Sequence, residues 1–209
     1  MEIRPREWDI LRAIEELGGR ARAEDVAEKA GLPLATLMSD ARSLAEKGLL
    51  SLQERLKRRV ELTEEGLAYA RRGLPERRLV SALAELGGRA PVREAAARAG
   101  LSRQELAIAL GWARRRGWVS VGQGALELLR EPERLPEEEA LSLLAAGPLS
   151  AEELARRGLS DALPVLERRG LVRVEERVER ILAITPAGLR VLELPRPEEE
   201  VSQLTPELI

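Results

Sequence analysis

Residues 18–32 read GGRARAEDVAEKAGL, and residues 87–101 read GGRAPVREAAARAGL. The shared letters, GGRA at the start and AGL at the end, lie 69 residues apart in both cases (87 − 18 and 99 − 30). Self-similarity at a fixed spacing is typical of a repeated structural unit. We therefore expect at least two copies of one unit in this chain.

A further motif extends the repeat to a third copy. Lys47-Gly48-Leu49 recurs 69 residues later as Arg116-Gly117-Trp118, and after a shorter step as Arg169-Gly170-Leu171. Each time, a glycine follows a helical pattern and precedes apolar residues in alternation, which indicates the end of a helix and the start of a strand. Three consecutive units follow from this pattern.

The first unit reads as three helices followed by a ribbon. Apolar residues at helical spacing lead up to Gly18-Gly19, a short helix covers 23–30, and a third runs from Pro33 to about 47. Near-alternation then continues to residue 62, which predicts two paired strands.

The charged segment 54–59 divides these two strands, so we predict that it is the tip of a hairpin. Lys57, Arg58 and Arg59 would lie on this tip. Thr63 is a good N-cap for a following helix that ends at Gly73.

The other two units repeat the order with less regularity. The expected helices cover about 76–86, 91–99 and 102–116 in the second unit, and 137–145, 150–157 and 161–169 in the third. The expected strands are 118–121 and 126–128 in the second unit, and 171–174 and 181–184 in the third.

Three helices followed by a ribbon is the winged-helix form of the helix-turn-helix fold. The predicted fold class is therefore mostly α with small β-wings, in three tandem winged-helix domains. Their expected bounds are 1–73, 74–131 and 132–195. Residues 196–209 read as a Pro-rich acidic linker, after which Thr205-Pro206-Glu207 opens a new helix.

The composition excludes several kinds of site. The chain has no Cys and no His, which rules out disulfides, thiolate sites, Ser-His or Cys-His catalysis and His-based zinc chemistry. No apolar run approaches the roughly 18 residues that span a membrane, and no signal peptide is visible. We expect a cytoplasmic protein with no metal site and no membrane contact.

Three segments carry a resemblance to a known family. Residues 62–69 (LTEEGLAY), followed by 73–78 (GLPERR), resemble the junction between the first two winged helices of archaeal phenylalanyl-tRNA synthetase α subunits. Residues 109–118 (ALGWARRRGW) resemble the third helix of the second unit in that family, and residues 203–208 (QLTPEL) resemble the entry to its catalytic domain. The resemblance covers essentially the whole chain, in the right order.

This resemblance implies a role in protein biosynthesis. The parent enzyme would join phenylalanine to its tRNA with ATP and Mg²⁺, as an assembly of two α and two β subunits, and this region would reach toward tRNA. The signature motifs for ATP and the amino acid lie beyond residue 209 in the family, and Gly122-Gln123-Gly124 lacks the context of a phosphate loop. We therefore expect no catalytic residue and no cofactor in this chain.

Charge points to the middle unit as the nucleic-acid surface. Lys and Arg minus Asp and Glu give 0 for residues 1–73, +4 for 74–131 (10 − 6) and −6 for 132–209 (10 − 16). Phosphate contacts need local positive charge. The candidate residues are Arg103, Arg114, Arg115 and Arg116 on the third helix of the middle unit, assisted by Lys57, Arg58 and Arg59.

Each of these candidates could instead have a purely structural role. The cations near 114–116 could complement the dipole of a helix C-terminus, and the cations at 57–59 could be a solvated tip. Trp112 and Trp118 could stack on unpaired bases, but packing is favoured for both. Gly111 costs about 1 kcal/mol inside a helix, which suggests close approach by another backbone, and a neighbouring unit is favoured over RNA.

Two other functions compete with tRNA binding. One is a winged-helix transcriptional regulator that binds duplex DNA as a dimer, against which stand the single basic unit and the lack of a long dimerisation helix. The other is a protein-interaction scaffold, which a net charge of −2 allows.

Overall fold

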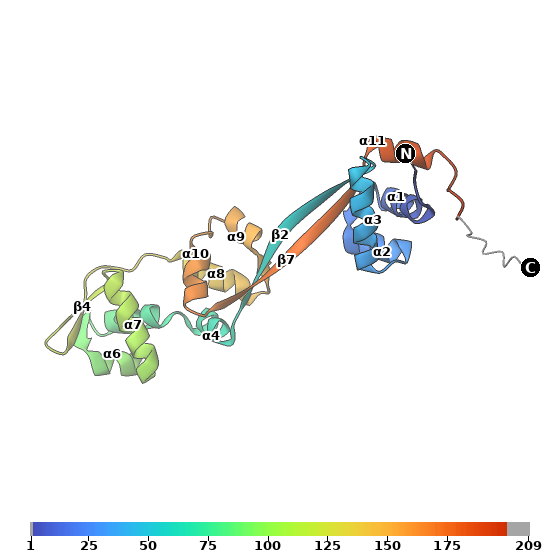
Figure 1. The fold of residues 1–209 in the computed structure, drawn as a ribbon. Coiled ribbons are helices and arrows are strands. Elements are labelled where there is room, and N and C mark those ends of the chain that lie inside the picture. Colours follow the sequence, from blue (N-terminus) through green and yellow to red (C-terminus); the bar gives the residue numbers. More distant parts are fainter. Residues whose placement is uncertain (1, 200–209) are drawn as a thin grey trace, which may run out of the picture. The chain divides into compact units, whose positions relative to one another are not determined.

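A computed structural model describes residues 2–199 (Figure 1). The fold is mixed α/β, with about 53% helix and two small antiparallel sheets. The helical share is lower than a mostly α chain would have, because two strands are 13 residues long each. The chain divides into two compact units, one made of the described parts of Met1–Lys57 and Arg177–Ile209, the other of Arg58–Glu176.

The first unit is built from both ends of the chain. Its elements are α1 (Pro5–Glu16), β1 (Arg20–Arg22), α2 (Ala23–Ala30), α3 (Leu34–Glu46), the start of β2 (Leu50–Leu62), the end of β7 (Val172–Ile184) and α11 (Pro186–Leu192). Ile10, Ile14, Leu37, Leu44 and Leu182 are fully buried in its core. Leu182 reaches this core from β7, far along the chain from the other four residues.

The second unit holds the rest of the described chain. Its complete elements are α4 (Glu64–Arg72), α5 (Pro75–Glu85), β3 (Arg89–Pro91), α6 (Val92–Ala99), α7 (Arg103–Arg115), β4 (Val119–Gly122), β5 (Ala125–Leu128), α8 (Pro136–Ala145), β6 (Leu149–Ser150), α9 (Ala151–Arg156) and α10 (Ala162–Arg168). One continuous core includes Leu79, Leu83, Trp118, Leu126 and Leu166. The two helical groups of this unit, α5–α7 and α8–α10, share this core.

The sheets show how the chain is interleaved. The larger sheet has the order β1-β7-β2-β6, and the smaller one has the order β3-β5-β4. β1 pairs antiparallel with β7, with Arg20 opposite Ala183, and β6 pairs antiparallel with β2, with Ser150 opposite Arg59. β2 therefore begins in the first unit and ends in the second, while β7 runs the other way.

This pairing corrects the prediction for the first ribbon. Residues 50–62 form the single strand β2, with no turn at 54–59, so Lys57, Arg58 and Arg59 lie within a strand and not on a hairpin tip. The physical reason is visible in the segment ERLKRR, which has none of the Gly, Asn, Asp or Pro residues that a tight turn needs.

The third ribbon is corrected in the same way. Residues 172–184 form the single strand β7, and the segment EERVER at 175–180 also lacks turn residues. In contrast, the predicted hairpin at 119–128 is confirmed, because Gly122-Gln123-Gly124 supplies the positive φ angles of a turn at Gln123 and Gly124. The predicted three-domain division stays a prediction.

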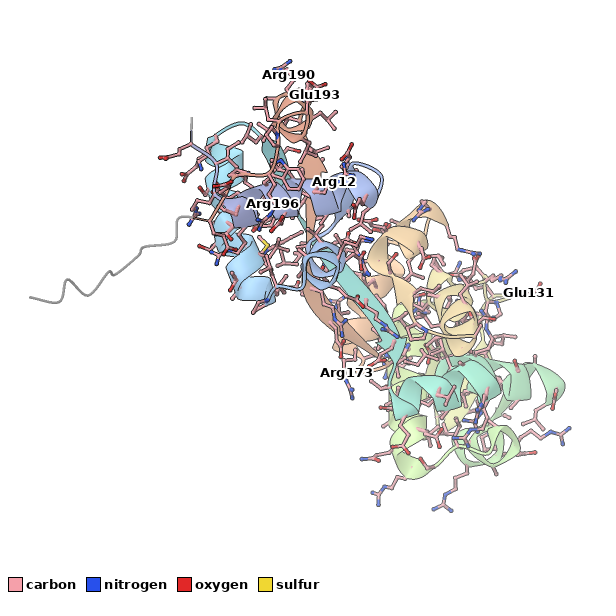
Figure 2. The ribbon with its side chains drawn as sticks, turned by 90° about the vertical axis from the view of Figure 1, so that its right-hand side faces the viewer. Arg12, Glu131, Arg173, Arg190, Glu193 and Arg196 are labelled. Carbon is pink, nitrogen blue, oxygen red and sulfur yellow. The ribbon has the colours of Figure 1, made fainter. Side chains whose placement is uncertain are left out.

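Most helix predictions are confirmed to within one or two residues, whereas the short strands β1, β3 and β6 were not predicted. The predicted linker is described only as far as residue 199. There Arg196 donates two hydrogen bonds to Asp9 of α1, at 2.7 and 2.8 Å, and Figure 2 labels Arg196 within the first unit. The helix expected at Thr205-Pro206-Glu207 lies outside the described residues.

In the second unit, Thr63 directly follows β2 and is the N-cap of α4. Its backbone N–H donates to Leu171 O at 3.0 Å, its hydroxyl donates to Gly170 O at 2.7 Å, and it accepts from the N–H of Gly66 at 3.1 Å. One side chain thus caps α4 and holds it to the start of β7.

The first unit contains the same arrangement, 122 residues later (185 − 63). Thr185 N–H donates to Leu49 O at 3.1 Å, its hydroxyl donates to Gly48 O at 2.7 Å, and Gly188 N–H donates to the hydroxyl at 3.1 Å. A β-carbon added at Gly188 would overlap the carbonyl oxygen of Leu49. This close approach explains the glycine in the first turn of α11.

Gly188→Ala is therefore expected to lower the free energy of unfolding by about 1–3 kcal/mol, because the added methyl group forces the helix away from β2. Urea unfolding of both proteins measures the difference. Gly111→Ala is the matched control, since Gly111 is also helical but has no atom within 4 Å of its added β-carbon. That control should gain up to ~1 kcal/mol. Unchanged stability of Gly188→Ala would contradict the close approach.

Candidate nucleic-acid interface

The start of α7 is fixed by a capping box. The Ser102 hydroxyl accepts from Glu105 N–H at 3.1 Å, and the Glu105 carboxylate accepts from Ser102 N–H at 3.3 Å and from Arg78 at 2.9 Å. Burial raises the pKa of Glu105, but these hydrogen bonds outweigh it and leave the pKa lowered. Glu105 is thus held as an anion that fixes α7 to α5.

One face of α7 is buried and the other is open. Ala109 and Ala113 are fully buried, and Leu106 and Leu110 pack against the core of the second unit. The opposite face is exposed and holds Arg103, Gln104, Ala107, Gly111, Arg114 and Arg115. Three of the four arginines predicted on this helix therefore lie on one accessible face.

None of these three arginines has a carboxylate partner within residues 2–199. Within residues 2–199, neither Arg103 nor Arg114 has a hydrogen bond or an ion pair to another side chain. By comparison, the exposed Arg98 on α6 donates to Glu85 at 2.9 Å. Uncompensated guanidinium groups on an exposed helix are suited to contact phosphate oxygens.

Arg116 lies in a different environment. Its side chain is only 17% exposed, lies 3.8 Å from Glu137 of α8, and has its guanidinium over the rings of Trp112 and Trp118 at 5.1 and 5.6 Å. This placement favours a packing role for Arg116 between the two helical groups of the second unit.

Trp112 and Trp118 both take part in packing. Trp118 is fully buried, and its indole N–H donates to Glu133 at 3.0 Å. The ring of Trp112 has three guanidinium groups within 4.5–5.5 Å of its centre. These placements favour packing over base stacking for both residues.

Gly111 is not explained by packing. It is exposed on α7, and a β-carbon added there would meet nothing within 4 Å. Within the second unit, no neighbouring segment comes close enough to require a glycine at this position.

The remaining predicted residues lie on β2. Lys57 pairs with Glu179 at 3.1 Å within the first unit, whereas Arg58 and Arg59 are exposed in the second unit. No described hydrogen bond or ion pair joins Arg58 or Arg59 to α7. A joint role of Lys57, Arg58 and Arg59 with α7 therefore stays a prediction.

Comparison with known proteins gives consistent relatives. No protein-family profile matches the chain. The phenylalanine–tRNA ligase alpha subunit of Methanopyrus kandleri is 34% identical over 196 residues, which cover 91% of this chain and 37% of that protein. The corresponding subunits of Thermococcus gammatolerans and Thermococcus kodakarensis are 36% and 37% identical, and the alignments cover 100% and 91% of this chain and 42% and 38% of those proteins.

The chain is homologous to the amino-terminal region of archaeal phenylalanine–tRNA ligase α subunits. The resemblance inferred from its motifs is thereby confirmed. The chain spans about two-fifths of the length of these ligase subunits.

In this ligase homologue, no helix within residues 2–199 is long and apolar enough to cross a membrane. The same described residues contain no group of three or more carboxylates that could hold a metal ion.

Sequence reasoning missed a buried ion pair of the ligase homologue. Arg169 donates to both oxygens of Glu76, at 2.6 and 3.0 Å, and their side chains are 6% and 0% exposed. A signal was present: Arg169 and Arg116 both precede the glycine that ends a third helix, and Glu76 and Glu137 both follow a helix-starting proline. Each arginine faces the glutamate of the other helical group, so the pairing crosses between α5–α7 and α8–α10.

Proposed function

We propose that this chain is a tRNA-binding module of a phenylalanine–tRNA ligase α subunit, built from tandem winged helices. Support for the fold comes from the succession of three helices and an antiparallel ribbon, which is complete in α5–α7 with β4 and β5. Support for the function comes from the homology to ligase α subunits.

The observation that carries the binding proposal is the exposed basic face of α7. Arg103 and Arg114 lie on it without a carboxylate partner in the described chain, in the region of net charge +4. The equivalent helices, α3 and α10, have no excess of exposed positive charge. Each exposes one arginine and one glutamate: Arg42 and Glu46 on α3, and Arg168 and Glu167 on α10. A phosphate backbone is therefore attracted most strongly to α7.

The partners of the whole enzyme follow from the same homology. We propose tRNA and the ligase β subunit as partners, in an α₂β₂ assembly in the cytoplasm. ATP and Mg²⁺ would be used by the part of the ligase subunit that this chain does not span.

The proposal is tested by titrating tRNA at several salt concentrations. Arg103→Ala/Arg114→Ala should weaken tRNA binding at least tenfold and reduce the slope of log K against log[salt] by about 1.8, since each lost phosphate contact on a duplex contributes about 0.9. Arg12→Ala/Arg98→Ala is the control, because it removes the same charge from two exposed arginines that already have carboxylate partners.

The control variant should bind nearly as the unchanged protein does. Equal loss in both variants would indicate a general charge effect, and unchanged binding in both would favour the protein-interaction scaffold. Equally tight binding to random duplex DNA would favour the transcriptional regulator.

A further inference from the structure

Three guanidinium groups surround one indole ring in the second unit. The centre of the Trp112 ring lies 4.5 Å from the guanidinium carbon of Arg169, 5.1 Å from that of Arg116 and 5.5 Å from that of Arg115. All three distances are within the range of a cation–π interaction, about 6 Å. Trp112 therefore restrains three cations at once.

Carboxylates offset the charge of two of these three cations. Arg169 has its two-point ion pair with Glu76, and Arg116 lies 3.8 Å from Glu137. Glu76 and Glu137 are 0% and 7% exposed, so both negative charges belong to the interior. The positive charges of Arg169 and Arg116 are therefore offset within the second unit.

Arg115 is the exception in this group. It is exposed, and within residues 2–199 it has no carboxylate partner. Its guanidinium carbon lies 5.5 Å from the centre of the Trp112 ring, and within residues 2–199 its N–H groups donate no hydrogen bond to a side chain. A planar guanidinium binds phosphate through its N–H edge, so the ring contact and a phosphate contact are compatible.

We propose that Arg115 is a preordered phosphate contact and that Trp112 is the residue that positions it. This inference rests on the proposed nucleic-acid binding and assigns distinct roles to the neighbouring arginines 115 and 116. Holding the side chain over the ring reduces the conformational entropy that Arg115 loses when it binds a phosphate. The ring contact thus makes Arg115 a better ligand than a freely rotating arginine.

The test compares arginine with lysine at position 115. Lysine keeps the charge but lacks the planar group that stacks on the ring and forms two parallel hydrogen bonds. We expect Arg115→Lys to weaken tRNA binding about threefold or more with the salt slope unchanged, and Arg115→Ala to weaken it about tenfold with the slope reduced by about 0.9. Arg98→Lys and Arg98→Ala are the matched controls and should leave affinity and slope unchanged.

A second readout follows Trp112 itself. Binding of tRNA to the unchanged protein should alter tryptophan emission, and Arg115→Ala should remove most of that change, because the Arg115 guanidinium lies over the Trp112 ring. Thermal melts of both position-115 variants should match the unchanged protein, since the side chain is exposed.

Lysine binding as tightly as arginine at position 115 would overturn the positioning role of Trp112. Unchanged binding by Arg115→Ala, alongside weakened binding by Arg103→Ala/Arg114→Ala, would overturn this inference and leave the proposed function intact. Unchanged binding in all of these variants would overturn both.

Discussion

Replacing Arg169 by alanine is expected to lower the free energy of unfolding of the second unit by about 3–5 kcal/mol, the usual effect of removing one partner from a buried ion pair. Glu76 is fully buried and would be left without a cation. Trp112 would also lose the guanidinium that lies 4.5 Å from its ring centre. Few single substitutions in this chain should be as damaging.

Denaturant unfolding followed by tryptophan emission measures this effect, because Trp112 and Trp118 report on the second unit and Trp8 on the first. Arg168→Ala is the neighbouring control. Arg168 is exposed, and its one described hydrogen bond goes to the backbone of its own helix, at Pro164. We expect that control to change stability by less than about 0.5 kcal/mol.

A double substitution checks the cause. Glu76→Gln/Arg169→Ala should recover part of the lost stability, because the buried side chain no longer carries a charge. A loss below about 1 kcal/mol for Arg169→Ala, or no recovery in the double variant, would show that the pair is not essential to this core.

A protein consisting of residues 1–73 is expected not to fold. It lacks β7, and therefore both the strand that pairs with β1 and the fully buried Leu182. It also lacks α11, whose N-terminus is held to the chain at Gly48 and Leu49 by Thr185. With one side of its core open, this fragment should show no cooperative transition in urea.

A shortened protein that contains only the two segments of the first unit should fold. Joining residues 2–57 to residues 177–199 through a short Asn-Gly turn retains every element of the first unit and the ion pair between Lys57 and Glu179. Circular dichroism and Trp8 emission should then show one cooperative transition. If residues 1–73 unfold cooperatively and the joined protein does not, the predicted domain boundary at 73 is the better description.

The helices were predictable because their signals are local. Thr63 caps α4 and Ser102 caps α7, and glycines in a left-handed conformation follow α2 and α6. The ribbons were not predictable in this way, because alternation shows that a segment is a strand but does not show which strand pairs with it. Two signals that the prediction did not use were present in the sequence. The segment 54–59 lacks turn residues, and the Thr63–Gly66 pattern recurs at Thr185–Gly188, which indicates two equivalent strand ends.

The candidate site was predictable in part for the same reason. Arg103 and Arg114 are 11 residues apart (114 − 103), about three helical turns, so helical periodicity puts them on one face, and both are exposed in the structure. Arg115 and Arg116 were predicted alike, although Arg116 lies seven residues after Ala109 and three after Ala113, which places it toward the buried side of the helix. Its partner Glu137, 21 residues later in the chain (137 − 116), was not predicted.

The interleaving of β2 and β7 also sets an order of assembly during translation. The first unit has its amino-terminal helices early, but it cannot be completed until β7 and α11 have left the ribosome. At about 5–20 residues per second, the 119 residues of 58–176 impose a delay of roughly 6–24 seconds. The second unit is contiguous and can fold during that interval, which would shorten the flexible loop that must close before the first unit forms. The amino-terminal helices are therefore synthesised before the second unit, but the unit that they belong to is completed after it.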